Sequence, residues 1–102
     1  MTSEVYRYNF VPALPLEDIE ASLVLAIMSA ESLHGEAQVR LDAAHYFDAE
    51  QRACVIDAST PVGRDVNRLF VGFVRREFGE DAFTVERIEK SQEHTQPQEI
   101  CT

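Results

Sequence analysis

Charged side chains of both signs occur at alternate positions in several strand-like segments, and they are the residues best placed for chemistry. If these segments form a sheet with one face open to solvent, that face would carry Arg7, Arg40, Asp42, Asp57 and Glu86. One strand register places Asp42 opposite Asp57, where like charges disfavour ionisation of both carboxyls and would suit acid/base work or cation binding. A register shifted by two residues places Arg40 opposite Asp57 as an ordinary ion pair, and this is the arrangement we expect.

The sequence contains no catalytic motif and no spacing typical of metal ligands. His34, His45 and His94 share no such spacing, and Cys54 and Cys101 form no zinc-like or disulfide pattern. The link over residues 11–15 lacks the glycines of a phosphate cradle and the cysteine pair of a metal-transfer site. We therefore predict no catalytic residue, no metal and no cofactor, which argues against an enzyme.

Hydrophobic periodicity and turn residues indicate six elements. Alternating aromatic residues predict a first strand, Gly35 and Gly79 are suited to end two helices, and Thr60 with Pro61 to begin the second of them. The polar segment after residue 89 predicts a flexible tail at 90–102, separate from a single domain at 1–89. The predicted elements are strands at 4–10, 37–46, 52–58 and 83–88 and helices at 16–33 and 61–78.

This order of elements predicts an α+β, ferredoxin-like β-α-β-β-α-β fold. The expected sheet is four-stranded and antiparallel with order 4-1-3-2, the first and third strands are expected to be parallel neighbours, and both helices are expected on one face. The strand residues expected to face the helices are Tyr6, Tyr8, Phe10, Val39, Leu41, Ala43, Cys54, Ile56, Ala58, Phe83 and Val85.

Charge and hydropathy exclude several classes of function. The 102 residues include 18 acidic and 9 basic side chains, for a formal net charge of −9 and a pI near 4.6. Such an acidic chain repels phosphate groups, so we expect neither a nucleic-acid partner nor an anionic membrane. The longest apolar run, 21–30, is about half a bilayer span and follows acidic residues, so the expected location is cytoplasmic.

The first predicted helix carries two apolar stripes instead of one. Leu16, Ile19, Leu23, Ala26, Ile27, Ala30 and Leu33 form the stripe expected to pack on the sheet. Ala21, Leu25 and Met28 lie on the opposite side with Val24 at its border, and a second stripe requires a cover. The second helix or the tail would provide one, and so would a partner protein.

These observations favour a small non-catalytic protein-interaction module that self-associates through Ala21, Val24, Leu25 and Met28. The partner would be a second copy or another protein. The alternative is a small-molecule-binding domain or small enzyme that uses the open sheet face with Arg7, Arg40, Asp42 and Asp57. A third hypothesis, an acidic mimic of nucleic acid, is disfavoured by the arginines of the second helix, of which Arg64, Arg68 and Arg75 are expected on one solvent-exposed face.

Overall fold

Eight segments of regular structure follow one another within residues 4–88, the part of the chain that the computed structural model describes. They are β1 (Val5–Phe10), α1 (Leu16–His34), α2 (Glu36–Asp42), β2 (Ala44–Asp48), β3 (Ala53–Asp57), α3 (Pro61–Phe78), the 3-10 turn η1 (Glu80–Ala82) and β4 (Phe83–Ile88). The predicted α+β class is confirmed. The predicted tail at 90–102, and with it the boundary at residue 89, lie outside the described residues.

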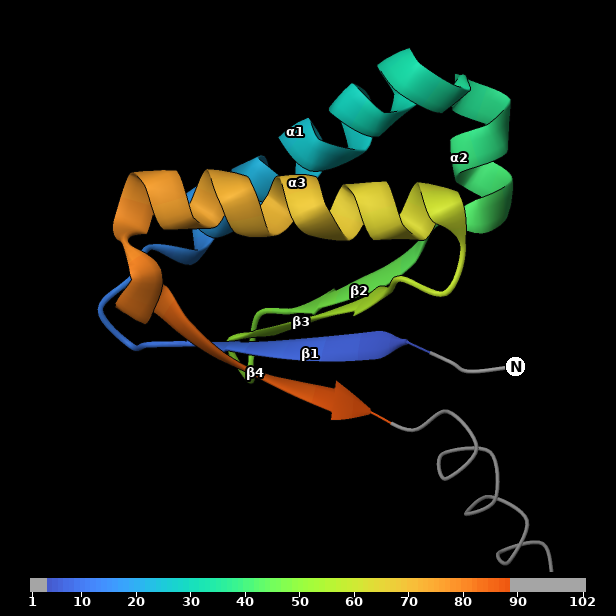
Figure 1. The fold of residues 1–102 in the computed structure, drawn as a ribbon. Coiled ribbons are helices and arrows are strands. Elements are labelled where there is room, and N and C mark those ends of the chain that lie inside the picture. Colours follow the sequence, from blue (N-terminus) through green and yellow to red (C-terminus); the bar gives the residue numbers. More distant parts are fainter. Residues whose placement is uncertain (1–3, 89–102) are drawn as a thin grey trace, which may run out of the picture.

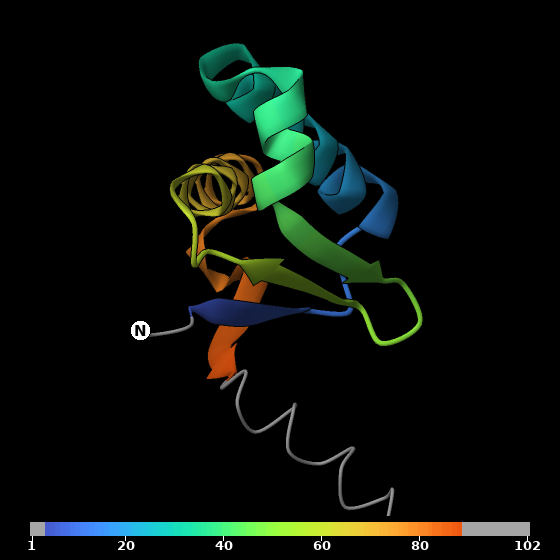
Figure 2. The same cartoon turned by 90° about the vertical axis from the view of Figure 1, so that its right-hand side faces the viewer.

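The four strands form an antiparallel sheet with the order β2-β3-β1-β4, which reads β4-β1-β3-β2 from the other edge. Tyr8 in the centre of β1 lies opposite Cys54 of β3 and Val85 of β4. All three helices cover the same face of the sheet, and the opposite face has no helix over it (Figures 1 and 2).

The predicted ferredoxin-like fold with two helices and a parallel central pair is wrong for this chain. The structure has three helices, and β1 pairs with β3 in the antiparallel direction. β3 runs antiparallel to β2 because a tight turn reverses the chain, and β1 points in the same direction as β2, so β1 and β3 run in opposite directions.

The helix that was not predicted, α2, occupies residues that were expected to begin the second strand. The alternation of Ala37, Val39 and Leu41 resembles a strand, but Glu, Ala, Gln, Arg and Leu are all strong helix formers. Side-chain bonds one turn apart add to this preference: Arg40 to Glu36 at 3.1 Å and Gln38 to Asp42 at 2.6 Å. Helix α2 therefore runs through Asp42, and β2 begins only at Ala44.

The ends of the helices match the predicted capping residues. The Thr60 hydroxyl accepts a hydrogen bond from the Gly63 amide at 2.9 Å, with Pro61 at the first helical position. Gly35 and Gly79 follow α1 and α3 with positive φ angles of 92° and 95°, a backbone conformation that favours glycine.

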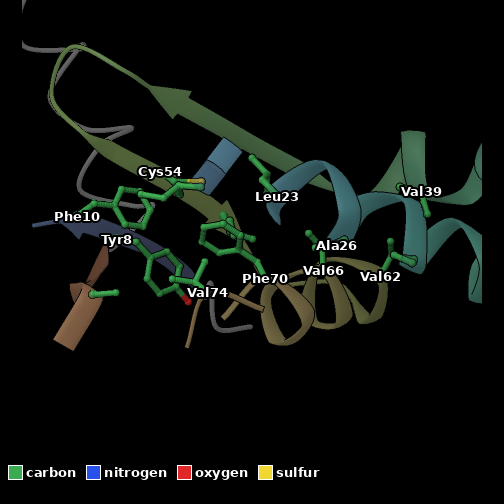
Figure 3. Packing of buried hydrophobic residues seen from close by; sticks show 14 residues of the cluster. Tyr8, Phe10, Leu23, Ala26, Val39, Cys54, Val62, Val66, Phe70 and Val74 are labelled. Carbon is green, nitrogen blue, oxygen red and sulfur yellow. The ribbon is translucent and has the colours of Figure 1, made fainter. Parts of the chain in front are cut away.

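The core lies between the sheet and the helices (Figure 3). The rings of Phe70 and Phe10 meet edge to face with centroids 6.2 Å apart, and Cys54 is buried nearby. Leu33 and Leu41 were expected to face inward but are exposed, and Val85, which lies opposite the buried Tyr8 on the helix side of the sheet as expected, is still 50% exposed. Leu41 on α2 is 78% exposed, and Leu33 belongs to the last turn of α1, the end of the helix that rises away from the sheet (Figure 1).

Candidate functional site

The outer side of α1 presents the second apolar stripe to solvent. Ile19, Ala26 and Ala30 on the inner side are completely buried, because an advance of about 100° per residue puts all three on the side of α1 that packs against the rest of the domain. On the opposite side, Val24 is 50% exposed, Leu25 49% and Met28 56%, and Ala21 is also exposed. Within the described residues, neither α3 nor any other element covers this stripe.

Polar residues border the stripe on both sides. Ser29 donates its hydroxyl to the Leu25 carbonyl at 2.8 Å, and Ser32 donates to the Met28 carbonyl at 3.4 Å. These hydroxyls already donate to carbonyls inside the helix, so burying them under a partner protein would break fewer hydrogen bonds to water. The exposed carboxylates of Glu17 and Glu20 lie at one end of the stripe, and Glu31 lies near the other. The surface thus has an apolar centre and an acidic border.

The four residues predicted to bind a ligand on the open face are not brought together. Arg40 and Asp42 belong to α2, so neither of the two expected registers exists, and Ala44 is the residue opposite Asp57. Arg40 pairs with Glu36, and Asp42 accepts from Gln38. The strand placement that grouped these residues is therefore corrected.

Arg7 and Asp57 do lie on the open face, where both have structural hydrogen-bond partners. Arg7 donates to Asn9 at 3.1 Å and to Gln51 at 2.8 Å, and its Nε lies 3.9 Å from a Glu86 carboxylate oxygen. Asp57 accepts from the Ser59 amide at 2.9 Å at the turn that leads into α3. Both side chains order the backbone or a neighbouring side chain.

The structure offers little for acid/base or metal chemistry. In residues 4–88, no three His, Cys, Asp or Glu side chains are grouped closely enough to hold a metal ion. His34 and Asp65 form a bridge of 2.8 Å that joins the end of α1 to α3. Burial raises the pKa of the Cys54 thiol to about 12, so the reactive thiolate is scarce at neutral pH.

A cleft between α3 and the sheet has no counterpart among the predictions from sequence. Arg68 and Arg75 were assigned to an exposed helix face, and Tyr6 and Tyr8 to the core. In the structure Arg68, Arg75, Tyr6 and Tyr8 all line this cleft. The signal that indicates it is Gly72, a residue that weakens a helix yet stands in the middle of α3.

Comparison with known proteins gives no relative for this arrangement. No family model, no characterised protein and no solved structure matches the chain. The helices of residues 4–88 also include none with the length and apolar character needed to cross a bilayer.

Proposed function

We propose that the protein is a non-catalytic interaction module that self-associates through the outer stripe of α1, formed by Ala21, Val24, Leu25 and Met28. The observation that carries this proposal is the exposure of three large apolar side chains in a row, directly opposite the buried side of the same helix. An apolar centre with a polar border is typical of protein interfaces, and methionine adapts its shape to a partner.

The size of the stripe sets the expected affinity. Burying the half-exposed Val24, Leu25 and Met28 of two copies would contribute roughly 4 to 9 kcal/mol. Association itself costs about 4 to 15 kcal/mol of lost freedom. Gain and cost are of similar size, and the most favourable balance is about 5 kcal/mol, so the dimer is weak, with a dissociation constant of about 0.2 mM or above.

The acidic border makes this association dependent on salt. Two antiparallel α1 helices in contact would bring Glu31 of one copy toward Asp18 and Glu20 of the other. Salt screens repulsion between exposed charges, so the dimer should strengthen as the sodium chloride concentration rises. A partner with a basic border would show the opposite dependence.

Light scattering coupled to size-exclusion chromatography, from micromolar to millimolar protein, tests the proposal. The double variant Leu25→Glu/Met28→Glu should be a folded monomer. The control Leu41→Glu/Tyr46→Glu adds the same charge at two exposed residues outside α1 and should associate like the wild type.

Three results would contradict the proposal. The first is a wild type that stays monomeric at millimolar concentration in high salt. The second is equal association of both double variants, which would place the contact elsewhere. The third is unfolding of Leu25→Glu/Met28→Glu by circular dichroism, which would assign these side chains to the core.

A further inference from the structure

A cleft of about 410 Å³ lies between α3 and the β1 and β4 strands, away from the α1 stripe. Its volume is within the range of small-molecule sites. The residues that line it are Tyr6, Tyr8, Asn67, Arg68, Val71, Gly72, Arg75, Phe83 and Val85.

The body of the cleft is apolar and aromatic. The rings of Tyr8 and Phe83 meet edge to face with centroids 5.1 Å apart, which fixes both in position. Val71 and Val85 add aliphatic surface on the α3 side and the β4 side. A flat apolar group would find ring faces and methyl groups to contact on several sides.

The polar groups of the cleft are mainly donors and cations. The Tyr8 hydroxyl donates to Asn67 Oδ1 at 2.5 Å, so the group that Asn67 offers a ligand is its Nδ2 donor. Burial raises the pKa of Tyr8 to about 12, so this hydroxyl stays neutral. Arg68 and Arg75 stand two turns apart on α3, and the lining contains no acidic residue although the whole chain carries a net charge of −9.

Gly72 keeps the cleft open. Its backbone is ordinary helix, and a Cβ added there would meet no atom within 4 Å. Packing therefore does not require glycine at this position, and glycine destabilises a helix interior by about 1 kcal/mol relative to alanine. The empty space beside the Gly72 backbone is part of the cleft.

We propose that this cleft binds a small organic anion with a flat apolar body, of the aryl carboxylate or aryl sulfonate class. The rings of Tyr6, Tyr8 and Phe83 would contact the body of the ligand. The guanidinium groups of Arg68 and Arg75 at the rim would bind its anionic group, because charge-assisted bonds to arginine suit carboxylate and sulfonate oxygens.

Fluorescence titration with anilinonaphthalene sulfonate tests this inference, and its neutral parent phenylnaphthylamine serves as the matched probe. The wild type should bind the sulfonate at least about tenfold more tightly than the neutral compound, the effect of one charge-assisted bond. Arg68→Gln/Arg75→Gln should remove that preference. Arg64→Gln/Arg76→Gln, which changes two arginines of α3 outside the cleft, should retain it.

The variant Gly72→Phe fills the cleft and should abolish binding of both probes with an unchanged circular dichroism spectrum. Amide chemical shifts of the wild type locate the probe independently of any variant and should change most at Val71, Gly72 and Phe83. Equal affinity for the two probes, binding retained in folded Gly72→Phe, or shifts gathered on α1 would each overturn the inference.

Discussion

Helix α3 contains two glycines for which alanine should have opposite effects on stability. Gly63 lies in the first turn, where a Cβ would overlap the carbonyl oxygen of Asp57 at the end of β3. Gly72 lies near the middle of the helix, where a Cβ would meet nothing within 4 Å. Comparing the same substitution at these two positions of one helix therefore separates two effects on stability, that of close backbone packing and that of intrinsic helix propensity.

The structure sets the sign and size of each effect. Gly72→Ala should stabilise the protein by about 1 kcal/mol, the difference in helix propensity, and raise its melting temperature by roughly 4 to 8 °C for a domain of this size. Gly63→Ala forces α3 and the end of β3 apart. Such overpacking costs about 1 to 3 kcal/mol, more than helix propensity returns.

Urea denaturation followed by circular dichroism measures both free energies of unfolding, and thermal melts provide a second estimate. If both variants change the free energy of unfolding in the same direction, the reasoning is refuted, because the close approach of α3 to β3 would then not distinguish Gly63 from Gly72. A destabilised Gly72→Ala would show that the space beside Gly72 is closed in solution.

Four further predictions concern the loop after β1, the buried titratable groups and the α1 border. Arg52→Ala should lower the free energy of unfolding by about 2 kcal/mol in urea titrations, because the Arg52 guanidinium donates to the Val11 and Leu14 carbonyls at 2.8 and 2.6 Å; the exposed Arg40→Ala should cost under about 0.5 kcal/mol. Burial raises the pKa values of Tyr8 and Cys54 to about 12, so only the unfolded chain ionises these groups at moderately alkaline pH, and stability should fall as pH rises above about 9; Tyr8→Phe should flatten this decline, and an unchanged slope would contradict the assignment. Cys54 should resist iodoacetamide at pH 8 until urea unfolds the protein, as followed by peptide mass spectrometry, and rapid labelling of the native protein would show that Cys54 is accessible. Glu31→Lys should strengthen self-association and reverse its salt dependence in light scattering, whereas an unchanged dimer would place Glu31 outside the interface.

Residues with one dominant local signal were predictable from sequence. The limits of α3 follow from Thr60, Pro61 and Gly79, whose capping roles depend on neighbours within a few residues. The outward stripe of α1 follows from helical spacing alone, and Leu25 and Met28 are exposed as that spacing requires.

Residues 36–42 could not be assigned in the same way, because two local signals disagree. An alternation of only three apolar residues is too short to distinguish a strand from a helix. Val39 is the one buried residue of α2, so burial in the core also gives no periodic pattern that would favour either structure. This single error placed Arg40 and Asp42 on the sheet and produced the expected charge pairing, whereas both residues belong to α2. The cleft was also hidden, because its lining comes from β1, α3 and β4, which are distant in sequence.

The central position of β1 has a consequence for how the chain acquires its fold during synthesis. β1 emerges from the ribosome before both of the strands that pair with it. Tyr8 can pair with Cys54 only after β3 has been made, and Val5 pairs with Ile88 at the far end of the described chain. Contacts over such long separations slow folding and leave strand edges unpaired in the meantime. The helices can form as they are translated, whereas the sheet closes only after β4 has been made.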